Sequence, residues 1–227
     1  MFYTATLNSN AVVGTDGNPN ETYLTYGESD TQTSHSKTKT YTWPVSIVKY
    51  TGSDTTTNRL AGASFTLTKA DVSWNASGSA ITFTGSNNVY KPSTSGSATI
   101  TTNSSGTFMF SGLDSGNYLL TETVAPAGFN KIANPIRVKI DISYDGTALT
   151  MTPSYTVESP SQASNSGTVS TTDSTIYVQN NTGAELPSTG GMGTTLLYVV
   201  GGAMVVFATS ALVARRRATA SANASKE

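Results

Sequence analysis

The chain has 227 residues, a formal net charge of −1 and no cysteine. A charge this close to zero gives no electrostatic basis for binding nucleic acid, and the lack of cysteine excludes disulfides and thiolate metal sites. Charged residues are only 12% of the sequence, whereas Thr, Ser and Gly abound, which is typical of solvent-facing β-strands and turns.

The first 42 residues are predicted to be the end of one β domain followed by a linker. Residues 21–27 alternate like a strand, but too few neighbouring segments could pair with them to build a sheet. Residues 27–40 are expected to form the linker. They include a Ser/Thr-rich run around His35, which is expected to be a solvated loop residue rather than a base or a metal ligand.

Residues 43–181 are predicted to form one all-β domain. Alternating or apolar runs indicate strands at 43–50, 60–68, 80–83, 98–100, 106–110, 116–124, 134–141, 148–157 and 175–180. Residues 159–172 are expected to be a polar loop without regular structure. Because no helical periodicity precedes the apolar segment near the C-terminus, the expected fold class is an all-β sandwich.

Three predicted strands each place one polar residue on their apolar face. Strand alternation groups them with apolar neighbours: Lys49 with Val45 and Ile47, Glu122 with Tyr118, Leu120 and Val124, and Asn180 with Ile176 and Val178. Buried Lys and Glu are rare unless they are paired, so a meeting of the three in the core is one interpretation. The alternative is that Lys49 reaches the surface at a strand end, Glu122 has another partner and Asn180 opens a turn.

The C-terminal part combines a short motif, an apolar segment and a basic cluster. The motif is Leu186, Pro187, Ser188, Thr189 and Gly190, within a linker over residues 182–193. Residues 194–214 carry no charge and are long enough, at about 1.5 Å per residue, to cross a ~30 Å hydrocarbon core as a transmembrane helix. Three arginines open the tail 215–227, which is expected to be cytoplasmic, leaving the motif outside. Hydropathy alone leaves open a plain, permanently retained anchor.

This order of motif, span and basic tail resembles the LPXTG cell-wall sorting signal of Gram-positive surface proteins. The resemblance implies that a sortase, of the pilus or the housekeeping type, cleaves after Thr189 and joins it to an amine of peptidoglycan or of another subunit. The precursor would be secreted, held briefly in the membrane by residues 194–214, and then anchored to the cell wall. No secretory signal peptide opens the chain, so residue 1 is expected to be an internal point of a longer precursor.

Two blocks in the main domain resemble the collagen-adhesin B-type (Cna-B) domain, also described as SpaA-like or prealbumin-like. They are residues 60–65, after the lysine-bearing strand, and residues 118–129. The resemblance implies an immunoglobulin-like sandwich with an isopeptide bond between Lys49 and Asn180. A protonated Glu122 would donate to the side-chain carbonyl of Asn180 and act as proton shuttle. Residues 7–27 resemble the closing strands of the preceding domain in fimbrial shaft proteins, where Asn20 would accept an equivalent bond.

The expected function is therefore structural. The sequence has no Ser/His/Asp set, phosphate-binding glycine loop or metal-spaced cluster, so we expect no enzyme beyond single-turnover isopeptide formation, and no cofactor or metal. The favoured interpretation is the C-terminal part of a sortase-assembled pilus shaft pilin, with sortase, other pilin subunits and peptidoglycan as partners. The alternatives are an accessory pilin or the stalk module of a wall-anchored adhesin, with a host ligand. A shaft pilin also needs an acceptor lysine, and before residue 41 only Lys37 and Lys39 are available.

Overall fold

The computed structural model describes residues 7, 8, 10–53, 56–146, 150–160 and 167–183, together with residues 203, 204, 209, 210 and 215. The chain divides into two compact units, Met1–Ala184 and Glu185–Glu227. The sorting motif and nearly all of the expected transmembrane segment and basic tail lie outside the described residues. Within the described part, no helix is both long and apolar enough to cross a membrane.

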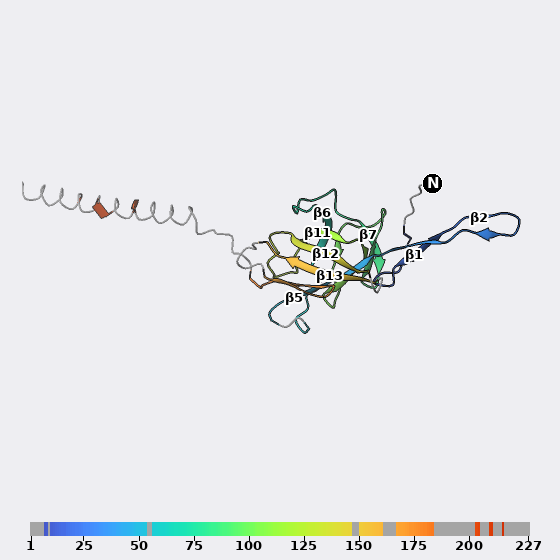
Figure 1. Cartoon of the computed structure of the whole chain (residues 1–227). Coiled ribbons are helices and arrows are strands. Elements are labelled where there is room, and N and C mark those ends of the chain that lie inside the picture. Colours follow the sequence, from blue (N-terminus) through green and yellow to red (C-terminus); the bar gives the residue numbers. More distant parts are fainter. Residues whose placement is uncertain are drawn as a thin grey trace, which may run out of the picture. The chain divides into compact units, whose positions relative to one another are not determined.

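Two sheets form a β-sandwich in the described part of the first unit (Figure 1). One sheet has the order β14-β15-β5-β10-β8-β7, with β5 at Trp43–Tyr50, β7 at Phe83–Ser86, β8 at Val89–Pro92, β10 at Thr107–Leu113, β14 at Val169–Thr172 and β15 at Thr175–Gln179. The other has the order β13-β12-β11-β6-β9, with β6 at Ser64–Ala70, β9 at Ile100–Thr101, β11 at Gly116–Val124, β12 at Ile136–Asp145 and β13 at Thr150–Glu158. The predicted all-β sandwich is confirmed.

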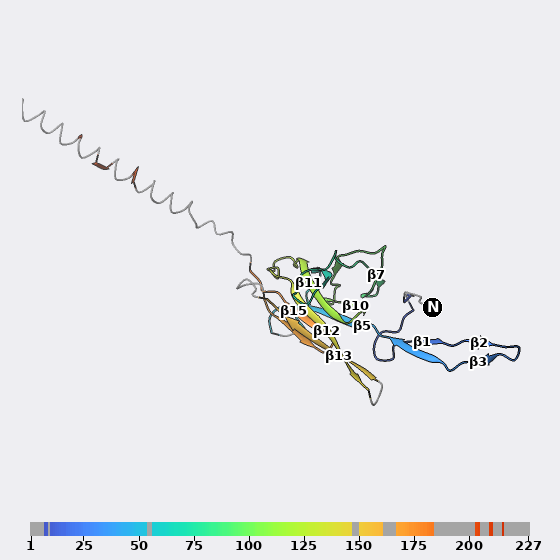
Figure 2. The ribbon, with the colours of Figure 1, turned by 45° about the horizontal axis from the view of Figure 1, so that its top comes forward.

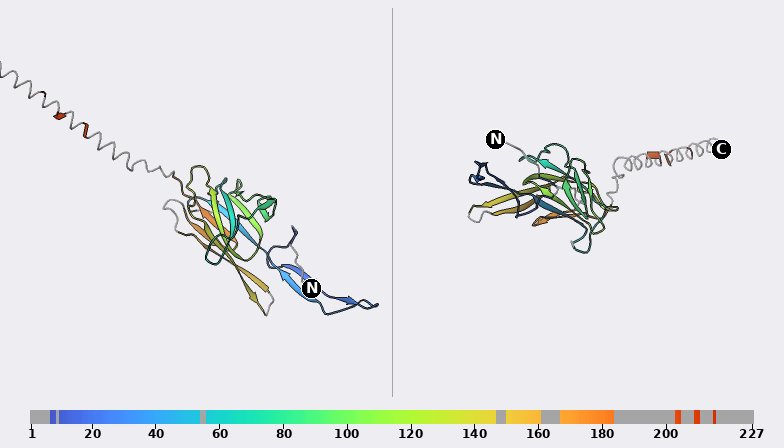
Figure 3. Two further views of the ribbon diagram at one scale, coloured as in Figure 1. Left: turned by 90° about the horizontal axis from the view of Figure 1, so that it is seen from above. Right: turned by 90° about the vertical axis from the view of Figure 1, so that its right-hand side faces the viewer.

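The first and last long strands of the first sheet are direct neighbours. β5 pairs antiparallel with β10 on one side and parallel with β15 on the other. In the second sheet, β11 lies between β6 and β12, and β12 pairs with β13 along the whole length of β13 (Figure 3). The parallel β5–β15 pair therefore brings together residues that are far apart in the chain.

The space between the sheets is filled by apolar side chains whose alternation the sequence predicts. The buried set includes Trp43, Val45, Ile47, Phe65, Leu67, Phe108, Phe110, Tyr118, Leu120, Ile136, Val138, Ile140, Ile176 and Val178. Phe65 of one sheet meets Phe108 of the other, with 5.8 Å between ring centroids. Each such side chain stabilises the fold by roughly 1.5–3 kcal/mol relative to exposure. Any polar group in this layer must therefore find a partner inside it.

One part of the sandwich differs from the sequence prediction. Residues 159–172 are predicted to be a loop, yet Val169–Thr172 forms β14 and pairs with β15. A short polar segment can form an edge strand because the partner strand supplies the backbone hydrogen bonds. β10 and β11, which are consecutive and joined by a short turn, lie in opposite sheets rather than side by side.

The N-terminal region forms a two-stranded ribbon (Figure 2). β1 (Asn18–Thr22) pairs antiparallel with β4 (Ser36–Thr40), and β2 (Thr25–Tyr26) pairs with β3 (Thr31–Gln32). The expectation that residues 27–40 form a linker is wrong, because they supply the returning arm of this hairpin. Cross-strand contacts explain the pairing: Tyr23 stacks on His35, with ring centroids 4.3 Å apart, and Glu21 contacts His35 and Lys37.

Candidate functional site: a buried lysine, glutamate and asparagine

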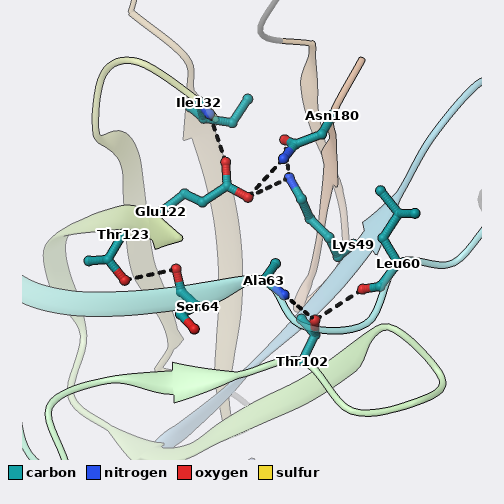
Figure 4. Close-up of polar contacts among 9 residues, drawn as sticks. All are labelled: Lys49, Leu60, Ala63, Ser64, Thr102, Glu122, Thr123, Ile132 and Asn180. Atoms are coloured by element: carbon teal, nitrogen blue, oxygen red, sulfur yellow. Dashed lines mark hydrogen bonds and ion pairs between the residues drawn. The ribbon is translucent and has the colours of Figure 1, made fainter. Parts of the chain in front are cut away.

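Three polar residues meet between the two sheets of the sandwich. Lys49 lies on β5, opposite Val178 of β15, and Asn180 follows directly after β15. The Asn180 backbone N–H donates to the carbonyl of Tyr50 at 3.0 Å, which holds the end of β15 beside β5. Glu122 comes from β11 in the other sheet. Figure 4 shows the three side chains converging.

The triad is sealed from solvent and its polar atoms are paired with one another. Lys49, Glu122 and Asn180 are 0%, 1% and 0% exposed. Lys49 Nζ donates to Asn180 Oδ1 and lies 3.0 Å from Glu122 Oε1. Asn180 Nδ2 donates to the same Oε1 at 3.0 Å. One carboxyl oxygen thus contacts both the amine and the amide nitrogen.

The second carboxyl oxygen is held by the backbone. Glu122 Oε2 accepts the N–H of Ile132 at 2.7 Å (Figure 4). Ile132 is buried and lies in the segment between β11 and β12. A backbone N–H has no side-chain signature, so the sequence offers no signal for this contact. It directs Oε1 towards Lys49 and Asn180.

Burial changes the acid–base behaviour of the lysine. Desolvation lowers the pKa of Lys49 from 10.5 to about 8, although the nearby Glu122 acts in the opposite direction. Nζ also lies 5.7 Å from the ring centroid of Phe65, which closes the site on one side. The neutral amine, which can act as a nucleophile, is therefore far more accessible here than for a lysine on the surface.

Strand alternation on β11 stops directly after Glu122. Val124 is expected to face the core with Glu122, but it is 54% exposed, so this part of the prediction is wrong. The pairing register of β11 with β6 shifts between Glu122 and Val124, which is a β-bulge. A bulge adds one residue and reverses the direction of the side chains that follow.

One detail of the triad also differs from the sequence hypothesis. That hypothesis has a protonated Glu122 donating to the side-chain carbonyl of Asn180. In the structure Lys49 Nζ donates to this carbonyl oxygen, and Glu122 Oε1 instead accepts from the amide nitrogen. The carboxyl group therefore lies beside the nitrogen that would leave as ammonia, and the amine lies beside the carbonyl group that it would attack.

The remaining predicted site residues lie elsewhere. Asn20 is exposed on β1, opposite Thr38 of β4, and its Nδ2 is 3.5 Å from Thr38 Oγ1. Lys37 and Lys39 are exposed on β4. The five residues of the sorting motif, 186–190, are outside the described part of the chain.

Two protein families match parts of the chain. Residues 46–154 match the SpaA family, described as a prealbumin-like fold domain, and residues 178–220 match the LPXTG cell wall anchor motif. The chain carries a SpaA-type domain followed by an LPXTG cell wall anchor. It is a cell-wall-anchored surface protein of the Gram-positive type. The SpaA-type domain contains Lys49 and Glu122, whereas Asn180 falls in the segment matched by the anchor motif.

The chain is also similar to several solved structures. These include the group B streptococcus pilus 2b backbone protein (24% identity, TM-score 0.38, covering 68% of this chain and 46% of that one). The T6 backbone pilin of serotype M6 Streptococcus pyogenes is 16% identical, with a TM-score of 0.43, and the match covers 78% of this chain and 46% of that one. The shaft pilin SpaA from Lactobacillus rhamnosus GG is 16% identical, with a TM-score of 0.38, and the match covers 67% of this chain and 50% of that one. The chain thus spans half or less of the length of these pilins. No curated protein matches it.

Proposed function

We propose that this chain is the C-terminal part of a sortase-assembled pilus shaft subunit that is stabilised by an isopeptide bond between Lys49 and Asn180. The observation that carries the proposal is the sealed Lys49–Glu122–Asn180 triad in the core of the sandwich. Lys49 and Glu122 lie in the SpaA match at residues 46–154, and Asn180 lies at the start of the LPXTG anchor match at residues 178–220. A buried amine and amide at contact distance are costly as permanent separate groups, because burial penalises each of them. A covalent bond between them would replace the buried amine with a neutral amide and so remove its desolvation penalty.

The geometry supports a reaction in which Glu122 carries out each proton transfer. One proton moves from Lys49 Nζ to Glu122 Oε1, which gives a neutral amine and a neutral carboxylic acid. The amine then attacks Cγ of Asn180, so that the Nζ–Cγ bond forms and the Cγ–Nδ2 bond breaks. Glu122 delivers its proton to Nδ2 and takes one from Nζ, and Nδ2 leaves as ammonia. Oε1 is 3.0 Å from both nitrogens, as this relay requires.

The folded domain lowers the activation barrier of this single turnover by holding the reacting groups together. Holding amine and amide in contact contributes on the order of 7–11 kcal/mol relative to a bimolecular reaction. The bond would link positions 131 residues apart in sequence. By loop-closure entropy such a link stabilises the fold by roughly 5 kcal/mol. It would join neighbouring strands β5 and β15, so that tension along a fibre passes through a covalent bond in a chain without cysteine.

The anchor defines how the subunit would be joined to its neighbours. Sortase would cleave between Thr189 and Gly190 and hold Thr189 as a thioester until an amine of the next pilin or of peptidoglycan releases it. Residues 190–227, including the segment 194–214, would then be absent from the mature protein. The domain order is residues 43–181 as the sandwich, 182–193 as the linker with the motif, and 215–227 as the cytoplasmic tail of the precursor.

Residues 1–42 would complete the domain that precedes the sandwich. The β1–β4 ribbon has only two strands in the described residues, and its side chains are almost all exposed. A two-stranded ribbon with open edges is what remains of a larger sheet when its partners are missing. Asn20 on this ribbon would accept the equivalent bond from a lysine upstream of this chain.

Two experiments test the proposal. The intact mass of the folded ectodomain should be lower than the sequence mass by one ammonia, and Lys49→Ala should restore the full mass, whereas Lys139→Ala, at an exposed position on β12, should not. A mass equal to that of the sequence in folded wild-type protein would rule out the bond.

Assembly is tested separately in cells. Replacing Leu186 and Pro187 by alanine should abolish wall attachment without changing the ammonia loss of the domain. A ladder of high-mass species on a denaturing gel, lost in the same variant, would identify a shaft pilin. Single-length attached protein without a ladder would instead favour an accessory pilin or the stalk module of an adhesin.

A further inference from the structure

The bulge in β11 lies directly beside the group that would move the protons. Glu122 is opposite Phe65 of β6 and Val124 is opposite Ser64, so Thr123 is the additional residue. Bulges bend a strand and redirect the side chains next to them, and they recur beside active sites. The direction in which Glu122 points is therefore coupled to the conformation of Thr123.

The Thr123 side chain connects the bulge to β6, the neighbouring strand of the same sheet. Its Oγ1 donates to the backbone carbonyl of Ser64 at 3.1 Å (Figure 4). Ser64 is itself buried, and its Oγ is 2.8 Å from Thr101 Oγ1 on β9. Through these two hydrogen bonds the bulge is connected to β6 and, beyond it, to β9.

The position of the bulge also determines the path of the chain to Ile132. After Glu122 the next side chain of the same parity, Val124, points outward, and the chain leaves the sheet. The following segment returns to place the Ile132 N–H on Glu122 Oε2. A change in the bulge would therefore move both the carboxyl group and the donor that orients it.

We propose that Thr123 is a positioning residue for isopeptide formation. Its hydroxyl holds the bulge in the conformation that keeps Glu122 Oε1 in hydrogen-bond contact with both Lys49 Nζ and Asn180 Nδ2. This inference rests on the proposed bond between Lys49 and Asn180. Thr123 itself does not touch the reacting atoms, because its side chain bonds to Ser64 rather than to the triad.

The test compares the rate of ammonia loss among variants of the full ectodomain. Newly translated chains are quenched with acid at successive times, and the fraction that has lost ammonia is read from the intact mass. Thr123→Val removes the hydroxyl but keeps the branched shape, and the rate should fall at least about tenfold because small misplacements of reacting groups are costly. Thr123→Ser keeps the hydroxyl and should react at close to the wild-type rate.

Thr121→Val is the matched control, because it makes the same chemical change two residues earlier, where Thr121 pairs in regular register with Thr66. It should leave the rate unchanged. Thermal unfolding in the Lys49→Ala background, where no bond can form, separates positioning from stability. There T123V and T121V should have similar melting temperatures, although only T123V slows the reaction.

The outcomes distinguish this inference from the proposed bond. Wild-type protein that folds without losing ammonia contradicts the bond itself. Wild-type loss with an unchanged rate in T123V, or an equal slowing in T121V, overturns the role of Thr123 alone. If T123V does not fold, the comparison is made between Thr123→Ala and Thr123→Ser, and equal rates in that pair also overturn the role.

Discussion

Two lysine–glutamate contacts among the described residues have similar lengths but very different surroundings. Lys49 Nζ is 3.0 Å from Glu122 Oε1 in the sandwich, with both side chains 0% exposed. Lys37 Nζ is 3.3 Å from Glu21 Oε1 on the N-terminal ribbon, with side chains 74% and 41% exposed. The distances are nearly equal, so the two sites differ mainly in how far their side chains are exposed to water.

The largest cause of the pKa shift differs between the two sites. On the ribbon, hydrogen bonds from His35 and then Lys37 hold the pKa of Glu21 below its usual value, so partners dominate. In the core, desolvation lowers the pKa of Lys49 to about 8 in spite of its partner. The exposed contact stabilises ordinary charged forms, whereas the buried contact makes a neutral, nucleophilic amine accessible.

The largest expected difference between the two sites appears when each glutamate is removed. Glu122→Ala should prevent the isopeptide bond and leave Lys49 buried without its partner, so the free energy of unfolding should fall by roughly 5 kcal/mol or more. Glu21→Ala should change it only slightly, since exposed ion pairs contribute little. Urea unfolding of the two variants measures both effects. Similar losses in the two variants would contradict the distinction.

A pH series on an uncrosslinked variant gives the next largest effect. In Asn180→Ala no bond can form, and we expect Lys49 to keep a folded-state pKa of about 8 against 10.5 when unfolded. Between these values the unfolded chain binds more protons, so stability should rise with pH, by about 3 kcal/mol in total. The loss of stability caused by burying Lys49 is fully present below pH 8.

The control for this series is the double variant Asn180→Ala, Lys49→Met. Desolvation raises the pKa values of the buried Tyr118 and the partly buried Tyr155. Both tyrosines are present in both variants, so their effects at high pH cancel in the comparison. The double variant should lack the rise between pH 8 and 10.5. An equal rise in both variants would show that Lys49 is not its source.

The smallest effect concerns order within the ribbon. Amide hydrogen exchange should be fast at residues 18–40, because a two-stranded ribbon is only marginally stable without further strands. His35→Ala removes the stacking on Tyr23, and a cross-strand pair contributes only about 0.2–1 kcal/mol, so it should accelerate exchange modestly. Strong protection of Tyr23–Tyr26, comparable to that of β5, would argue against a missing sheet partner.

Much of the sandwich can be predicted from its pattern. β5 and β11 have the predicted bounds, and alternation assigns Lys49, Glu122 and Asn180 to the side of their strands that the structure buries. This succeeds because side chains alternate with a fixed period, whichever strand lies alongside. The same rule fails at Val124, since a bulge is not visible in the period of the preceding residues.

Pairing is where prediction from the sequence stops. The ribbon is interpreted as a strand and a linker because its second arm, Ser36–Thr40, has no apolar face, and β14 is overlooked for the same reason. Both segments become strands through a partner's backbone groups, which local composition does not report. The donor at Ile132 is likewise a backbone group that only the returning segment places on Glu122.

The sequence by itself determined the fold class, the inward side of the strands that carry the triad, and the order of sorting motif, apolar segment and basic tail at the C-terminus. These follow from properties of neighbouring residues: period, length and charge. Only the tertiary structure decided that β15 lies parallel to β5, that Glu122 faces them from the other sheet, and that one carboxyl oxygen contacts both nitrogens. Contacts across 131 residues depend on how the whole sandwich closes around its apolar core, and local pattern does not encode that closure.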